Sequence, residues 1–223
     1  MKKVLIAMAF AFTASLSMLA QSSIFNNPAN KAYFGIRVAG EVTCPGEVSE
    51  DGTGISVFKN GGGVEFGGIF NAPVVANFYI EPGLKFYYNT YSMKGDFVGA
   101  IDNSSLIKSV ITKKFGMRIP VMAGYHFDFT DDIKVSVFTG PELEIGFSAK
   151  EKVSSRTIDV SNDLYGDDAA LNRVDLLWGM GAGITYQHVY FGVSGSLGML
   201  NMLHDSDFTF HENRVSFTLG YNF

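Results

Sequence analysis

The sequence of 223 residues is poor in cysteine, proline and charge: it has one cysteine and 6 prolines, and charged side chains make up 17% of it. A single cysteine, Cys44, excludes an internal disulfide and so excludes the small secreted domains that disulfides hold together. After the first 20 residues, no stretch comes near the roughly 18 consecutive apolar residues of a membrane helix. The formal net charge is −5, and an acidic chain of this kind gives no reason to expect nucleic acid among its partners.

The first 20 residues have the composition of a signal peptide. Residues 1–3 (MKK) are basic, residues 4–12 (VLIAMAFAF) are apolar, and residues 13–20 (TASLSMLA) are mostly small. We expect cleavage after Ala20, with a neighbouring bond as the alternative because Met18 is not ideal at position minus three. A membrane anchor is the other interpretation, but the apolar stretch is short for a span. Cleavage removes two of the 17 basic side chains, against 22 acidic ones, and makes the net charge −7.

Aromatic residues and glycine are abundant, with 20 Phe, 10 Tyr and 25 Gly. In residues 78–88 (FYIEPGLKFYY), apolar side chains alternate with polar or small ones, so that Phe86 falls on one face and Lys85 on the other. Alternation with period two indicates a β-strand with one apolar side. The pattern predicts strands over residues 32–43, 62–70, 78–88, 115–127, 134–148, 173–186, 189–200 and 214–223.

The last of these segments ends the chain on an aromatic residue. Residues 214–223 (RVSFTLGYNF) place Phe217, Leu219, Tyr221 and Phe223 on the apolar face. This ending resembles the terminal signal by which bacterial outer-membrane barrels are recognised, and the resemblance implies the barrel assembly machinery as a partner. A soluble β-sandwich also alternates, but it has no reason to end in this way.

The connections between these segments alternate in length. The links after the second, fourth and sixth strands have about 7, 6 and 2 residues, and the others (44–61, 89–114, 149–172 and 201–213) have about 13 to 26. Short turns at one end and long loops at the other are typical of outer-membrane barrels. We therefore predict an all-β fold, an eight-stranded antiparallel up-and-down transmembrane β-barrel over residues 32–223. A signal peptide (1–20) and a periplasmic segment (21–31) would precede it, with outer-membrane lipids around it.

The polar face of the strands carries many charges. We expect these residues to form a hydrogen-bonded polar network in the lumen, with carboxylates clustered around Arg37, Lys85 and Arg118; a proton or ion path is the alternative. The predicted network consists of Arg37, Glu41, Glu65, Glu81, Lys85, Arg118, Glu142, Glu144 and Asp175, and His126 and Arg214 share its face.

Outward aromatic residues near the strand ends are expected to form girdles at the two membrane interfaces. The periplasmic girdle would contain Phe34, Phe70, Phe78, Tyr125, Tyr186, Phe191, Tyr221 and Phe223. The outer girdle would contain Phe86, Tyr88, Phe115 and Phe147. Inward glycines make room for larger neighbours, and the run Gly179 to Gly183 lies within a strand, so a nucleotide-binding turn is not expected there.

Several short motifs carry a narrower resemblance. Ile119-Pro120-Val121 after a long loop, Gly140-Pro141, Gly181-Ala182-Gly183 and the closing Tyr221-Asn222-Phe223 resemble the PorT-like outer-membrane β-barrel family of Bacteroidetes-type barrels. The resemblance implies an integral outer-membrane barrel, and for PorT itself a part in type IX secretion.

Three classes of function remain. The first is a non-enzymatic barrel, without cofactor or metal, that has a structural role or binds an extracellular or secretion partner through its outer loops. The second is a small-solute or hydrophobic-ligand channel like the OmpW-type barrels. The third is a lipid-modifying enzyme, which needs a histidine beside a serine and a carboxylate. Its nearest candidates are His204, Asp205, Ser206 and His211. A metal site at the two histidines is a further alternative, although the spacing of loop residues fixes no geometry. We expect the first class.

Overall fold

The computed structural model describes residues 31–50, 52–101, 107–155, 159–165, 170–204 and 207–223. The expected signal peptide, its cleavage site and most of the expected periplasmic segment lie outside the described residues. The described chain has eleven strands. The longer ones are β1 (Tyr33–Pro45), β4 (Phe58–Val75), β5 (Phe78–Met93), β6 (Ile107–Asp128), β7 (Ile133–Ser155), β9 (Val174–Tyr186), β10 (Val189–Gly198) and β11 (Glu212–Asn222). The shorter elements are β2 (Val48–Glu50), β3 (Thr53–Ile55), β8 (Asp159–Asp163) and the helix α2 (Gly95–Ile101).

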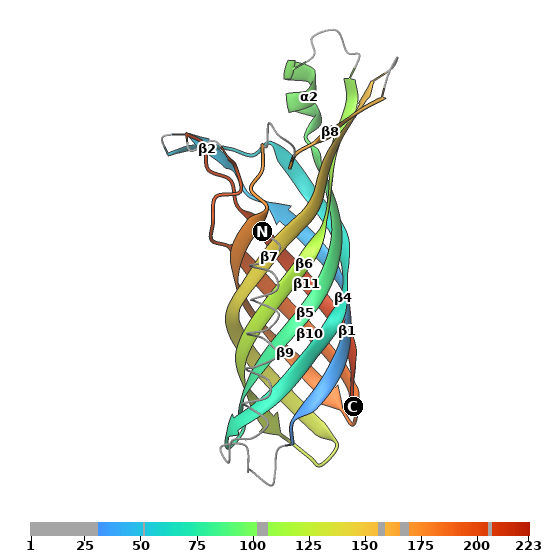
Figure 1. The fold of residues 1–223 in the computed structure, drawn as a ribbon, viewed down its shortest axis with the longest axis vertical. Coiled ribbons are helices and arrows are strands. Elements are labelled where there is room, and N and C mark those ends of the chain that lie inside the picture. Colours follow the sequence, from blue (N-terminus) through green and yellow to red (C-terminus); the bar gives the residue numbers. More distant parts are fainter. Residues whose placement is uncertain (1–30, 51, 102–106, 156–158, 166–169, 205–206) are drawn as a thin grey trace, which may run out of the picture.

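The long strands run up and down in one antiparallel sheet, as the alternation predicts. Their order is β6-β5-β4-β1-β11-β10-β9-β7, and β6 also pairs with β7. The sheet curls into a barrel (Figure 1). The first and last strands lie side by side, with Gly35 opposite Asn222, and the amide of Phe223 donates a hydrogen bond of 2.8 Å to the carbonyl of Phe34. No helix in the described ranges is long and apolar enough to cross a membrane.

The two ends of the barrel differ. At the short-turn end, connections 76–77, 129–132 and 187–188 join successive strands. Ala76 and Gln187 have φ angles of 48° and 54°, which is the left-handed conformation that two-residue hairpin turns require. At the long-loop end lie β2, β3, β8 and α2 (Figure 1).

The strands extend further toward the long-loop end than the alternation predicts. β6 begins at Ile107 and β7 ends at Ser155, inside segments expected to be loops, and the predicted loop 44–61 contains β2 and β3. Beyond the lipid a strand needs no apolar outer side, so the alternation stops while the backbone pairing continues. The sequence signal therefore marks the lipid-facing part of each strand, and the ends of the strands were predicted wrongly.

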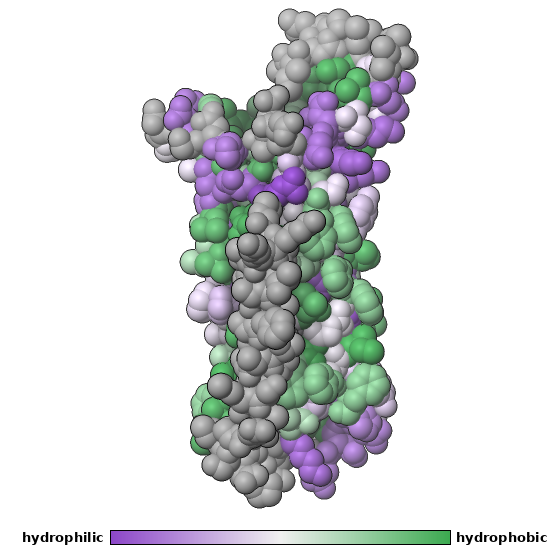
Figure 2. All heavy atoms as spheres, in the orientation of Figure 1, coloured by the Kyte–Doolittle hydropathy of each residue, from purple (hydrophilic) through white to green (hydrophobic). Residues whose placement is uncertain are grey.

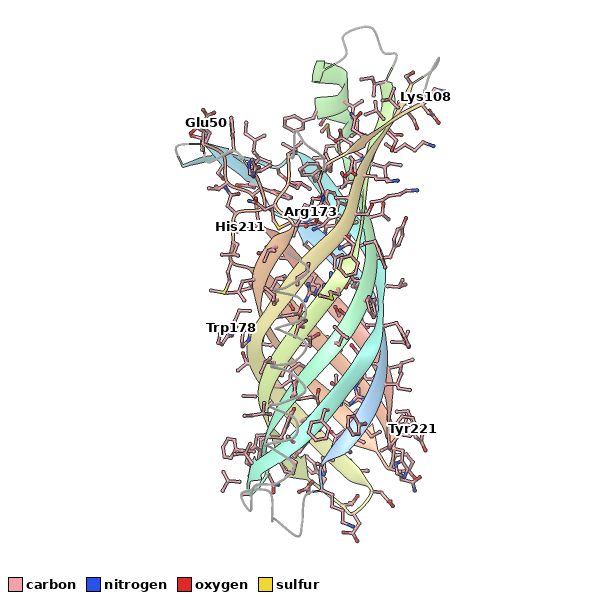
Figure 3. The ribbon with its side chains drawn as sticks, viewed as in Figure 1. Glu50, Lys108, Arg173, Trp178, His211 and Tyr221 are labelled. Carbon is pink, nitrogen blue, oxygen red and sulfur yellow. The ribbon has the colours of Figure 1, made fainter. Side chains whose placement is uncertain are left out.

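Exposed apolar side chains occur on all eight long strands and form a belt on the outside of the barrel. On the face that Figure 2 shows, more hydrophilic residues lie at both ends of this belt. Trp178 and Tyr221 point away from the barrel (Figure 3). Aromatic pairs lie near the margins of the belt: Phe34 and Phe70 have ring centroids 4.7 Å apart at the short-turn end, and Phe115 and Phe147 have centroids 5.7 Å apart nearer the long-loop end. These rings lie in the positions expected of interfacial girdles.

Because the belt faces lipid, the effect of an introduced charge on stability should depend strongly on its depth in the membrane. Phe217 is 51% exposed within the belt and Val160 is 48% exposed on β8 at the long-loop end. We expect Phe217→Arg to lower the free energy of unfolding by about 2–4 kcal/mol, because the guanidinium would face hydrocarbon, and Val160→Arg to change it by less than about 1 kcal/mol. Urea titration of protein folded in lipid vesicles measures both, and equal effects would contradict a lipid-facing belt.

Candidate functional site

The predicted network residues lie on the inner side of the sheet. Arg37, Glu41, Glu65, Arg118, Glu142, Glu144 and Asp175 are all buried, and Glu81 and Lys85 are half-buried. They are inward because their sequence neighbours, such as Phe66, Met117 and Ile145, form the outer side of the same strands. The inner side of the barrel is therefore a polar core containing many charges.

Arg118 on β6 is the centre of this core. Its side chain is 1% exposed and contacts carboxylates from three other strands. Nη1 donates to Glu41 at 2.6 Å and to Glu65 at 2.9 Å, and Nε donates to Glu144 at 2.8 Å. The ring centroid of Tyr87 lies 3.9 Å from the guanidinium carbon. Such a buried arginine ties β1, β4, β5 and β7 together across the lumen, since each contact is charge-assisted or cation–π.

Two like charges lie next to each other in this core. Lys85 on β5 is directly opposite Arg118 on β6, an arrangement that is unfavourable by itself. Glu65 compensates it, because Oε1 contacts the Lys85 ammonium at 2.9 Å and Oε2 contacts Arg118 at 2.9 Å. One carboxylate therefore bridges both cations.

Arg37 borders the same cavity as Glu81 and Glu142, but its close partner is an aromatic ring. Within the described part of the chain Arg37 forms no ion pair; its guanidinium carbon lies 4.2 Å from the ring centroid of Tyr190. The neighbouring Gly183 and Gly192 have no room for a Cβ because the Tyr190 ring occupies that space. Near this end of the core, Glu81 accepts a hydrogen bond of 3.0 Å from Asn71. The aromatic ring replaces the carboxylate as the partner of this cation.

The charged core continues toward the long-loop end with residues outside the predicted network. Lys114 is fully buried between Glu144, at 3.3 Å, and Glu212. Arg214 pairs with Glu142 and contacts Glu144 at 3.4 Å. Lys114 and Glu212 fall in segments expected to be loops. On β6, every second residue from Arg118 through Gly116 to Lys114 points inward. The sequence therefore did contain a signal for Lys114, but it was missed because the outward neighbour Lys113 is not apolar.

The connection after β8 covers the long-loop end of the core. Tyr165 packs with Ala149 and Leu171 in a buried cluster, and Arg173 donates a hydrogen bond of 2.6 Å to its carbonyl oxygen. Burial raises the pKa of Tyr165 to about 12, so the phenol stays protonated at neutral pH. At the same end of the barrel the rings of Phe58 and Phe210 have centroids 5.4 Å apart. Aromatic side chains thus cover this end of the lumen.

Little space is left inside. One cavity of about 40 Å³ borders Arg37, Lys85 and Tyr190, and a second of about 10 Å³ borders Arg118 and Arg214. A single water needs about 10–15 Å³, so these cavities hold a few waters at most. Around these residues the lumen of the described structure is largely filled by side chains.

A larger hollow lies outside the lumen, at the long-loop end. It has a volume of about 340 Å³ and lies between the hairpin of β2 and β3 and the helix α2. Its lining is mainly apolar, with Val48, Ile55, Val57, Phe97 and Phe208, while Glu50 and Thr53 are its polar members. This volume is at the lower limit of small-molecule pockets.

The candidates for catalysis and metal binding do not form a constellation in the described residues. His204 Nδ1 lies 3.3 Å from the side-chain oxygen of Asn172, and the carbonyl of His211 accepts a hydrogen bond from Gly46. Asp205 and Ser206 lie outside the described residues. No group of three or more metal-ligating side chains occurs in the part of the chain that the structure describes. The run Gly179 to Gly183 lies inside β9.

The buried ion pairs predict a large effect of removing Arg118. We expect Arg118→Leu to lower the free energy of unfolding by about 3–5 kcal/mol, because Glu41, Glu65 and Glu144 lose a buried partner. Lys152→Leu is the control, since Lys152 forms an exposed pair with Asp159 at 3.2 Å and such pairs contribute about 0–1 kcal/mol. Urea unfolding in detergent measures both, and an unfolding midpoint of the Arg118 variant equal to that of the control would contradict the central role of this arginine.

Known proteins similar to this chain include a family of outer-membrane barrels and several solved structures. Residues 10–204 match the description of the outer membrane protein beta-barrel domain, whereas no curated protein matches the chain. Among solved structures, the attachment invasion locus protein Ail of Yersinia pestis is 17% identical with a TM-score of 0.43, covering 87% of this chain and 100% of its own. OprG from Pseudomonas aeruginosa is 11% identical with a TM-score of 0.44, covering 86% and 96%. The outer membrane enzyme PagL is 12% identical with a TM-score of 0.41, covering 83% and 98%. The family match, which covers residues 10–204, shows that this chain belongs to the outer-membrane β-barrel domain family.

Proposed function

We propose that the protein is an integral outer-membrane barrel of eight strands, closed and sealed inside, that acts without catalysis through its long-loop end. The pairing of β6 with β7, from Ile107 opposite Ser155 to Asp128 opposite Lys134, supports closure. The eight long strands then each have two neighbours. The short turns, the start of β1 and the end of β11 would face the periplasm, and the long loops would face outward.

The observation that carries this proposal is the filled lumen. Arg118 contacts three carboxylates across the barrel, and the cavities beside it hold only a few waters. A solute channel would need a continuous path, and opening one here would separate buried charges at a cost of several kcal/mol. The interior is therefore a structural core, and the function lies at the surface.

The hollow beside β2, β3 and α2 favours a binding role. An apolar lining with one carboxylate, Glu50, suits a ligand with an apolar body. A secretion role would follow from the resemblance to PorT-like barrels, in which case the partner would be another protein of the envelope. Lipid modification has weaker support, since the described His204 contacts an asparagine.

The sealed lumen predicts that the protein does not conduct. Purified protein inserted into planar bilayers should give no discrete current steps above those of a mock preparation from cells without it, because ions cannot pass the charged core. Insertion is checked independently by resistance of the barrel to added protease. Reproducible steps that scale with the amount of inserted protein would overturn the sealed-barrel function.

The proposed orientation is tested by labelling from outside. In a Cys44→Ser background, we expect a cysteine placed at Thr53, on β3, to react with a membrane-impermeant maleimide in intact cells. A cysteine placed at Asp131, in a short turn, should react only after the outer membrane is opened, because it would face the periplasm. The matched pair differs only in the end of the barrel that carries the thiol, and the reverse pattern would invert the proposed topology.

A further inference from the structure

Two lysines face outward together just beyond the apolar belt. Lys113 on β6 and Lys150 on β7 are directly opposite each other, and both are exposed. Their sequence neighbours point inward: Lys114 and Ala149 are buried at 1% and 0% exposure. The two ammonium groups therefore project from the outer surface of adjacent strands, and we name Lys113 and Lys150 the basic pair.

The height of the basic pair matches the lipid headgroups. Phe115, two residues from Lys113 on β6, and Phe147 mark the margin of the belt. Lys150 is three residues from Phe147 on β7. Strands rise about 3.3 Å per residue and are tilted by about 45°, so the lysines lie about 5 to 7 Å above these rings. The headgroup layer on each side of the hydrocarbon is about 5–8 Å thick. The basic pair thus lies within that layer.

The basic pair would be stabilised by an anion bound between its two ammonium groups. Like charges directly opposite on neighbouring strands are destabilising, and within the described residues neither lysine forms an ion pair. The described acids on the neighbouring strand β8 form no ion pair with either lysine. Asp159 contacts Lys152 at 3.2 Å, and Asp163, opposite Lys150, accepts the amide of Tyr165 at 2.9 Å. In the core, Glu65 bridges the neighbouring cations Lys85 and Arg118. Among the described residues, no carboxylate bridges Lys113 and Lys150 in this way.

We propose that Lys113 and Lys150 together bind a phosphate of a phosphorylated lipid headgroup, with the acyl chains of that lipid lying against Phe115 and Phe147. The phosphate replaces the missing carboxylate between the two ammonium groups. The apolar rings below and the paired cations above match the two parts of such a lipid. This inference rests on the proposed orientation, in which the long-loop end faces the outer leaflet.

The test measures lipid retention by native mass spectrometry of the purified full chain in detergent, with bisphosphorylated lipid A as the probe. The double variant K113A/K150A should bind it at least about tenfold more weakly than the wild type, since each lysine near a charged lipid surface contributes about 1 kcal/mol. K113R/K150R should keep wild-type affinity because it keeps both charges. Added salt should weaken wild-type binding.

The matched control is K31A/K134A, which removes two lysines at the short-turn end, where Lys134 lies 3.6 Å from Asp128. It should bind the lipid as the wild type does, and gel mobility before and after heating verifies that each variant is folded.

Wild-type affinity in K113A/K150A would overturn the proposal, and so would equal binding of lipid A stripped of its phosphates. Displacement by inorganic phosphate at the concentration of the lipid would show that the pair selects free phosphate and would likewise overturn it. Bilayer conductance by the wild type would overturn the sealed-barrel function and leave these lipid results standing.

Discussion

Hydrocarbon offers no hydrogen-bond partner to a polypeptide backbone, and the architecture follows from that constraint. Each unpaired amide or carbonyl in the membrane costs several kcal/mol, so every strand needs a neighbour on both sides. β1 obtains them from β4 and β11, and β6 from β5 and β7. A sheet curled in this way has one side in lipid and the other enclosed, and the same alternation of side chains serves both environments.

The enclosed side carries charges because the barrel provides them with partners. Arg118 has three carboxylates and the face of Tyr87, and Lys114 lies between Glu144 and Glu212. Buried charge without such partners is strongly destabilising. Glycine at positions 183 and 192 leaves the space that the Tyr190 ring fills, and that ring in turn covers Arg37. The cavities that border these residues are correspondingly small.

Alternation alone was enough to predict the strands and the direction of their side chains where lipid covers them. The inward positions of Arg118, Glu65 and Glu144 followed from the apolar residues beside them. The partners of these charges could not be predicted, because they depend on which strands become neighbours and in what register, as Arg37 shows. Outside the lipid the alternation of apolar and polar residues disappears, because Lys113 and Lys150 occupy outward positions that would be apolar within the belt. For this reason β6 and β7 were expected to be shorter, and Lys114 was not predicted to be inward.

The bridge that Glu65 makes between Lys85 and Arg118 has a consequence for how the strands find their alignment. A slip of one residue turns every apolar side chain inward and is rejected by the membrane itself. A slip of two residues keeps each face correct, and hydrophobicity does not distinguish it from the native alignment. It would, however, move Glu144 away from Arg118, its directly opposite neighbour on β7. The buried charges therefore discriminate between alignments that are equivalent to the surrounding lipid.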